Sequence, residues 1–226
     1  MDFADMIIQD IIVLLEREYG LLNWNPKKRH LDVLIETILS QHTSDLNSHR
    51  AFKSLMGTFD NWQNVASASV ENIGQSIRCG GLSRVKATRI RQILQSIYNE
   101  RGDLTMDFLE SMSTADARDY LINLPGVGLK TASCVLLFSL GRPSLPVDTH
   151  IFRVVKRLGL LGPNISIKEA HSLLQNKIQP SKIYQFHVHV IMHGRLVCHA
   201  KSPRCSECVL EKGCPGSLAP RKISLT

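Results

Sequence analysis

Four cysteines near the carboxyl end of the chain have a spacing that suits a metal centre. Cys198 is followed after six residues by Cys205, after two more by Cys208, and after five more by Cys214. Four thiolates in so short a stretch can surround one centre, and both a zinc ion and a [4Fe–4S] cluster accept four cysteine ligands. The spacing leaves both alternatives open.

The loop between the first two of these cysteines is basic. It contains Lys201 and Arg204, which we expect to form a protrusion suited to phosphate. The whole chain has the same bias, with 27 Lys and Arg against 20 Asp and Glu and a formal net charge of +7. This surplus favours a polyanionic partner such as nucleic acid, because each cation placed near a phosphate releases condensed counterions.

A glycine-rich turn, Leu124-Pro125-Gly126-Val127-Gly128, separates two expected helices. Glycines permit a tight turn and allow a ligand to approach bare backbone N–H groups. The following helix adds its N-terminal dipole and its unpaired donors, so the turn suits an anion such as a DNA phosphate. The alternative is an ordinary corner between two helices.

Lys130 and Asp148 are the candidate catalytic residues. Lys130 falls in the first turn of the helix after the glycines, where the helix dipole favours the neutral amine that a nucleophile requires. Asp148, in the run Val147 to Val154 that also contains His150, directly precedes a helical segment and could be an N-cap, a carboxylate aimed at a reacting centre, or both. For Lys130 the alternative is a solvated lysine that only adds charge.

The elements that must position these residues are helices. Apolar residues recur at three- and four-residue spacing, and alternating strand patterns are nearly absent, which predicts an all-α protein. The expected helical segments are 5–18, 30–43, 46–57, 67–76, 84–99, 105–111, 115–122, 129–140, 149–159, 167–176 and 181–195.

Two helical domains are expected. Residues 30–142 form the first and end at a natural break, Gly141-Arg142-Pro143. The remaining third needs a packing partner that the N-terminal helix could supply, which gives a discontinuous second domain of 1–29 and 143–226. The tail from 216 to 226 looks irregular. Acidic residues interrupt the apolar start, so we expect no membrane segment and an intracellular, cytoplasmic or nucleoid-associated protein in which cysteines stay reduced.

The three motifs together and in this order resemble the endonuclease III family of helix–hairpin–helix DNA glycosylases. The resemblance runs from about residue 30 to Pro215. It implies a six-helix barrel carrying the hairpin, an iron–sulfur cluster domain, and a DNA-binding cleft between them. By this resemblance Lys130 is the nucleophile, Asp148 is the catalytic carboxylate, and the four cysteines hold a [4Fe–4S] cluster, with structural zinc as the alternative.

The resemblance also implies residues that enter the DNA. The segment 39–45 is similar to the one whose glutamine fills the gap left by an extruded nucleotide, and Gln41 is the candidate. Alignment without a gap would put His42 in that place instead. Leu82 resembles a second wedge, although Ser83 follows it where the family commonly has a tyrosine. Gly126, Val127, Gly128 and His150 complete the expected DNA contacts.

The expected function is therefore base-excision repair. We expect a monomer that binds damaged double-stranded DNA, removes oxidised pyrimidines such as thymine glycol, and cuts the strand by β-elimination. Alternatives are a monofunctional glycosylase of the adenine-excising or mismatch-thymine type, a non-catalytic DNA-binding metalloprotein, and an electron carrier. The adenine-excising branch lacks a lysine matching Lys130, and binding alone requires neither Lys130 nor Asp148.

Overall fold

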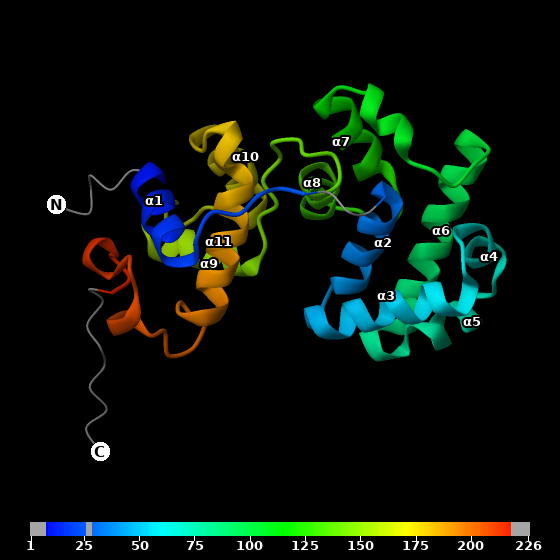
Figure 1. Cartoon of the computed structure of the whole chain (residues 1–226), viewed down its shortest axis with the longest axis horizontal. Coiled ribbons are helices and arrows are strands. Elements are labelled where there is room, and N and C mark those ends of the chain that lie inside the picture. Colours follow the sequence, from blue (N-terminus) through cyan, green and yellow to red (C-terminus); the bar gives the residue numbers. More distant parts are fainter. Residues whose placement is uncertain (1–7, 26–28, 218–226) are drawn as a thin grey trace, which may run out of the picture. The chain divides into compact units, whose positions relative to one another are not determined.

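The computed structural model describes residues 8–25 and 29–217, and it divides into two compact units (Figure 1). The contiguous unit is Asn25–Arg142, and the two-segment unit combines Met1–Trp24 with Pro143–Thr226. The described residues form helices and loops without a strand, so the all-α prediction is confirmed.

The contiguous unit is built from helices that mostly begin at a side-chain cap. The hydroxyl or amide oxygens of Ser44, Asn61, Ser69 and Ser113 each accept a hydrogen bond from the backbone N–H three residues on, which satisfies an otherwise unpaired donor at the start of the helix. Its helices are α2 (His30–Ser40), α3 (Asp45–Phe59), α4 (Trp62–Ser67), α5 (Val70–Ser76), α6 (Ser83–Arg101), α7 (Thr114–Asn123) and α8 (Leu129–Phe138).

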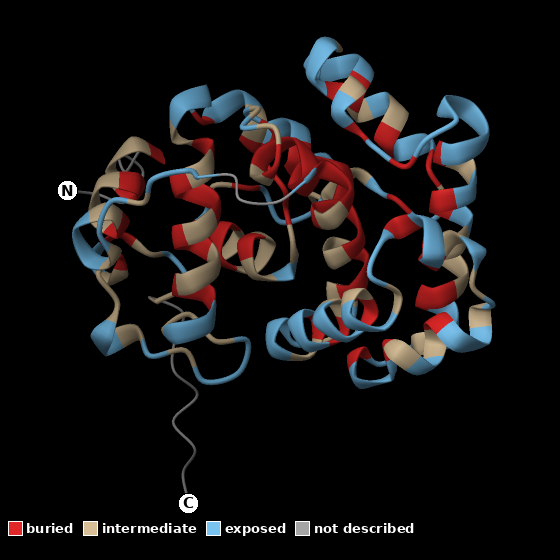
Figure 2. Cartoon of the chain, turned by 45° about the vertical axis from the view of Figure 1, so that its right-hand side comes forward, coloured by how far each residue is buried: buried red, intermediate tan, exposed pale blue. Residues whose placement is uncertain are grey.

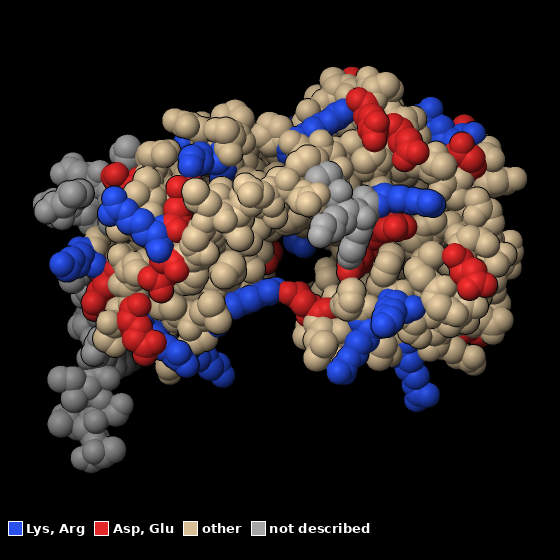
Figure 3. All heavy atoms as spheres, viewed as in Figure 1, with Lys and Arg blue, Asp and Glu red and all other residues tan. Residues whose placement is uncertain are grey.

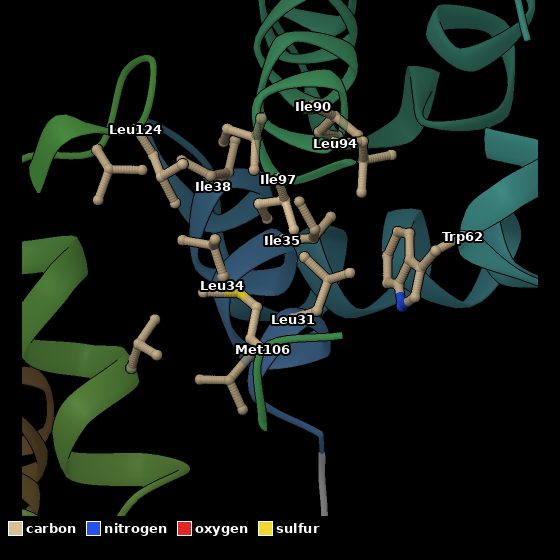
Figure 4. Packing of buried hydrophobic residues seen from close by; sticks show 14 of the residues in the cluster. Leu31, Leu34, Ile35, Ile38, Trp62, Ile90, Leu94, Ile97, Met106 and Leu124 are labelled. Atoms are coloured by element: carbon tan, nitrogen blue, oxygen red, sulfur yellow. The ribbon is translucent and has the colours of Figure 1, made fainter. Parts of the chain in front are cut away.

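Helix α2 runs through the centre of this unit and packs against α3, α6 and α8. Figure 4 shows Leu34, Ile35 and Ile38 of α2 surrounded by apolar side chains of the neighbouring elements. All three are completely buried, and each contributes roughly 1.5–3 kcal/mol by leaving water. The apolar core therefore fixes the carboxyl end of α2, which leads into Gln41 and His42.

The two-segment unit joins the first helix to the last third of the chain. It contains α1 (Ile8–Tyr19), α9 (Thr149–Arg157), α10 (Ile167–Lys177) and α11 (Ile183–Leu196). Helix α11 packs against both α1 and α9. The Lys182 ammonium lies 2.7 Å from the Glu16 carboxylate and ties the two segments together. Short 3₁₀ turns at Cys205–Glu207 and Glu211–Gly213 follow α11. Cys205 begins the first turn, Cys208 directly follows it, and Cys214 directly follows the second.

The predicted segments match the observed helices to within a few residues, with three exceptions. Residues 41–43 were expected to continue the helix that ends at Ser40, the segment 105–111 contains only the 3₁₀ turn Asp107–Ser111, and the region around residue 62 differs. Trp62–Ser67 is a separate short helix capped by Asn61, whereas the sequence pattern predicted a helix only from residue 67. Figure 2 shows the buried residues on the inward faces of the helices and the exposed ones outside, as their spacing predicts. In the described parts of the chain no helix is both long and apolar enough to span a bilayer. Most of the tail predicted to be irregular lies outside the described residues.

Candidate functional site

The glycine-rich turn forms a hairpin between α7 and α8 in the contiguous unit. Helix α7 ends at Leu124, whose carbonyl accepts a hydrogen bond from Val127 N–H at 3.1 Å. Gly126 has φ +72°, a left-handed conformation that side chains resist. Gly128 is the N-cap of α8 and, like Gly126, is exposed. The exposed backbone at the start of α8 thus provides the N–H groups and the dipole that an anion requires.

A side-chain network holds Gln41 against this hairpin. Arg89 of α6 donates from Nη1 to Oε1 of Gln41 at 2.8 Å, and the Gln41 amide nitrogen lies 3.5 Å from the Thr131 hydroxyl on α8. Arg89 also lies directly over Gly126, since a Cβ added there would be 2.8 Å from Arg89 Cδ. Sequence reasoning missed Arg89, because one arginine on a helix carries no signal of its tertiary partner.

Lys130 is the second residue of α8, immediately before Thr131 of this network. It is partly buried, and no acidic residue stands in the first turn of the helix to neutralise it. Its position thus puts a primary amine beside the anion-binding backbone of the hairpin. Lys130 belongs to the contiguous unit and Asp148 to the two-segment unit.

Two short loops of the contiguous unit carry the candidate residues that would enter DNA. The 41–43 loop (Gln41, His42, Thr43) follows α2, and the 81–82 loop (Gly81, Leu82) precedes α6. His42 is exposed with φ +54°, and Leu82 is 56% exposed with φ +48°. Gln41 is turned inward to Arg89, so of the two candidates for gap filling it is His42 whose side chain lies at the surface.

Asp148 is the N-cap of α9, as its position before the helical pattern predicts. Its Oδ1 accepts a hydrogen bond from Ile151 N–H at 2.8 Å. Among the described residues no donor is recorded for Oδ2. Capping uses one carboxylate oxygen and leaves the other for chemistry. His150 is half-buried, and its Nδ1 lies 3.2 Å from Nη2 of Arg153; because a guanidinium only donates, Nδ1 is the acceptor.

The four clustered cysteines line a single pocket in the two-segment unit. Apolar residues form its walls, among them Val154 of α9, Leu158 directly after α9, and Leu210 between the cysteines Cys208 and Cys214. Arg157 of α9 connects this pocket to the loop: Nη1 donates to Cys198 Sγ at 3.2 Å and to His199 O at 2.6 Å. A cation and an N–H donor directed at a sulfur stabilise a thiolate, so this arrangement suits a cysteine-bound metal centre.

Burial makes free thiolates unfavourable in this pocket. The pKa of Cys208 is raised to about 11, chiefly by burial and in smaller part by the neighbouring cysteines, while a hydrogen bond from the backbone N–H of Leu210 opposes the shift. Burial likewise raises the pKa of Cys214, and it lowers the pKa of His193, beside Cys208, to about 4. A cationic metal centre would supply the charge that four buried thiolates need.

The cysteines are not gathered around one point. Within residues 8–25 and 29–217, no three His, Cys, Asp or Glu side chains are close enough together to hold a single metal ion. A tetrahedral zinc site would require sulfurs about 3.8 Å apart, since Zn–S bonds are about 2.3 Å long. The pocket that the four cysteines line has a donor set that suits either centre.

The basic loop between Cys198 and Cys205 lies at the surface. Lys201 and Arg204 are both exposed, and Nη1 of Arg204 lies 3.6 Å from the Glu207 carboxylate. This exposed pair is worth little to stability, so Arg204 can exchange it for a phosphate. On the face seen in Figure 3, Lys and Arg side chains alternate with acidic ones on both units.

Comparison with known proteins finds one family. Residues 35–180 match the profile of the HhH-GPD superfamily of base-excision DNA repair proteins. Endonuclease III of Thermotoga maritima is 34% identical over 183 residues, which cover 80% of this chain and 81% of that protein. A DNA-glycosylase homologue of Arabidopsis thaliana is 37% identical over 180 residues, or 80% of this chain and 61% of that longer protein.

Solved structures give the same result. A non-covalent endonuclease III–DNA complex superposes with a TM-score of 0.81 at 28% identity, covering 93% of this chain and 95% of the other. A trapped covalent endonuclease III–DNA intermediate superposes with a TM-score of 0.79, also at 28% identity and with the same coverage. The helical fold is thus shared with proteins that have been captured on DNA.

Proposed function

This chain belongs to the endonuclease III family of HhH-GPD base-excision repair DNA glycosylases, and from that premise we propose that it is a bifunctional glycosylase and abasic-site lyase. Its substrate on this proposal is double-stranded DNA containing an oxidised pyrimidine such as thymine glycol, and it acts as a monomer. The observation that carries the proposal is Lys130, a primary amine in the first turn of α8 next to an anion-binding hairpin.

Lys130 is the proposed nucleophile. Its neutral amine attacks C1′ of the extruded nucleotide while the bond from C1′ to the base breaks, and the departing base gains a proton. The nitrogen loses one proton after it has bonded to C1′; the C1′–O4′ bond then breaks, O4′ takes up a proton from water, and the nitrogen and C1′ form a protonated Schiff base. Removal of a C2′ proton then expels the 3′ phosphate by β-elimination. The endonuclease III–DNA structure described as a trapped covalent intermediate supports this type of chemistry.

Asp148 is the proposed electrostatic partner. Positive charge develops on the sugar as the base leaves, and a fixed carboxylate stabilises it without having to reorganise. The hydrogen bond from Ile151 N–H to Oδ1 holds the carboxylate in place, and Oδ2 is the oxygen that would face the sugar.

DNA binding is proposed for the hairpin and the basic loop. The backbone N–H groups of Gly126 and Gly128 and the N-terminus of α8 would hold one phosphate, and Lys201 and Arg204 would contact another. Such contacts set the register on the duplex without reading its sequence. The 41–43 loop and the 81–82 loop would then enter the helix at the lesion.

A [4Fe–4S] cluster is proposed for the cysteine pocket. Cys198, Cys205, Cys208 and Cys214 would be its ligands, and Arg157 would stabilise the Cys198 sulfur. When bound, the group supplies structure to the basic loop. The protein residues then present Lys201 and Arg204 from a fixed loop, which lowers the entropy lost on binding DNA.

The test is covalent trapping with borohydride, which reduces a Schiff base to a permanent bond. Wild-type protein should form a covalent band with a thymine-glycol duplex and with an abasic duplex, and Lys130→Gln should form neither. Lys168→Gln, which changes an exposed lysine on α10, is the matched control and should trap as well as wild type. Base release without any band would instead indicate a water nucleophile and a monofunctional enzyme.

A further inference from the structure

Lys86 of α6 is a lysine inside the apolar core of the contiguous unit. Its side chain is completely enclosed, with 1% of the residue exposed, and it is surrounded by the buried residues of α6 and α2. Lysine is almost never fully buried unless its ammonium is paired. The ammonium must therefore have a structural task that outweighs its desolvation, and burial indeed lowers the pKa of Lys86.

The ammonium of Lys86 joins two separate segments of backbone. Nζ donates to the carbonyl oxygen of Leu39 at 2.7 Å and to that of Gly80 at 2.8 Å. Leu39 lies in the last turn of α2, where carbonyls have no partner within the helix. Gly80 ends the 3₁₀ turn Arg78–Gly80. Leu39 lies two residues before the 41–43 loop, and Gly80 directly precedes the 81–82 loop.

Both loops contain a strained residue next to this junction. His42 and Leu82 have positive φ angles of 54° and 48°, although neither is a glycine. Such conformations cost about 1–3 kcal/mol each and persist only where the surrounding structure over-determines them. Gly80 adds to this constraint, because a Cβ there would lie 3.0 Å from Ala51 Cβ on α3. The bases of the two loops are thus fixed by bonding and by packing.

We propose that Lys86 is a positioning residue that couples the 41–43 loop to the 81–82 loop, so that the two enter a duplex as one preorganised wedge. The inference rests on the proposed function for the identity of the target, which is DNA containing a lesion. Lys86 itself is enclosed and does not touch the nucleic acid. It acts by fixing the distance between the segments that carry His42 and Leu82.

A preorganised wedge affects a particular step. Extruding a paired base requires the loops to replace lost stacking, and loops held in their inserted form lose less entropy on entering the duplex. Loose loops would still bind phosphate through the hairpin, and Lys130 would still react with a base that is already unpaired. Loss of Lys86 should therefore impair extrusion selectively.

The experiment measures loop insertion without chemistry. Wild-type protein and Lys86→Met are bound to a duplex with a tetrahydrofuran abasic analogue opposite 2-aminopurine, whose fluorescence rises when neighbouring bases unstack. Ile93→Ala, a core truncation on the same helix, is the stability control. Wild type and Ile93→Ala should give the full rise, and Lys86→Met should give a rise at least about threefold smaller at saturating protein.

A second arm uses excision. With a thymine glycol in a fully paired duplex, Lys86→Met should release base at least about tenfold more slowly than wild type, and the difference should shrink to about threefold or less when the lesion lies in an unpaired bulge. A merely destabilised protein would be affected equally by both substrates. If Lys86→Met does not fold, Lys86→Gln, whose amide can reach one carbonyl, replaces it under the same criteria.

The outcomes separate this inference from the proposed function. A wild-type fluorescence rise in Lys86→Met, or equal slowing on both substrates, would overturn the coupling role. So would a wild-type protein that gives no rise, since its loops would then stay outside the duplex. A full wild-type rise that Lys86→Met loses, with no base release by wild type, would support the coupling while refuting the proposed excision.

Discussion

Asp148 combines a capping bond and a proposed catalytic charge in one side chain, and substitutions can separate them. Asn and Ser cap a helix about as well as Asp, whereas Ala does not. Asp148→Asn keeps an oxygen for Ile151 N–H and removes only the charge. Asp148→Ala removes both. The two variants should therefore differ in stability and agree in activity.

The expected magnitudes follow from the single capping bond of 2.8 Å. Loss of an N-cap costs about 1 kcal/mol, which lowers the Tm of a chain of this size by about 2–4 °C. Asp148→Ala should show this shift, and Asp148→Asn should stay within about 1 °C of wild type. Loss of a charge that stabilises the transition state slows an enzyme by about 10²–10³-fold, and both variants should show that loss.

The assay pairs thermal unfolding with single-turnover base release at saturating protein. Ser166→Ala is the matched control, because Ser166 caps α10 of the same unit through Glu169 N–H. It should lose about 1 kcal/mol of stability and keep full activity. The reasoning is refuted if Asp148→Asn releases base within about threefold of the wild-type rate, since the carboxylate would then serve only the helix.

Further predictions concern the hairpin, the cysteine pocket and pH. Gly126→Ala should weaken DNA binding, because its Cβ would displace Arg89. The control is Gly102→Ala, at a glycine with a similar φ of +77° but open space around it, which should lose only stability. Equal DNA binding by the two variants in gel-shift titrations would contradict this prediction. Arg157→Lys cannot reproduce the forked contacts to the cysteine loop, so the purified protein should contain less iron per chain by elemental analysis. It should also unfold about 4–8 °C lower, because about 2 kcal/mol of hydrogen bonding is lost. Unchanged iron content would contradict the proposed iron–sulfur centre in the cysteine pocket. Burial lowers the pKa of His189, with Lys182 adding to the effect and Gly20 and Glu16 opposing it. Because the imidazole takes up a proton at higher pH in the unfolded chain than in the folded one, His189 should make the free energy of unfolding decrease as pH falls below about 6.5. Chemical denaturation of His189→Phe across this pH range should show a weaker decrease.

The sequence predicted the elements well because helical periodicity and capping are local properties. Ser44 and Asp148 each stand just before a predicted helical segment, where their side chains cap the helix. The short helix at Trp62–Ser67 was missed although Asn61 carries the same kind of signal, because six residues are too few for an apolar period to emerge.

The contacts between distant segments could not be predicted in the same way. Lys86 lies in a segment whose spacing predicts a helix, but nothing in that spacing distinguishes a solvated lysine from a buried one. Its acceptors, Leu39 and Gly80, are backbone carbonyls, which every residue possesses. Arg89 and Arg157 present the same difficulty, since their partners are set by tertiary packing. Motifs thus identified the reactive groups, and the structure was needed to identify what holds them.

The division of one unit between the two ends of the chain has a consequence for biosynthesis. The apolar face of α1, which includes Ile11, Ile12 and Leu15, is synthesised more than 160 residues before its packing partner α11. Meanwhile the contiguous unit emerges whole and can fold on its own contacts. Contacts of such long sequence separation form slowly, and an unpaired apolar helix is exposed to aggregation until they do. Chaperone demand during translation should accordingly centre on α1.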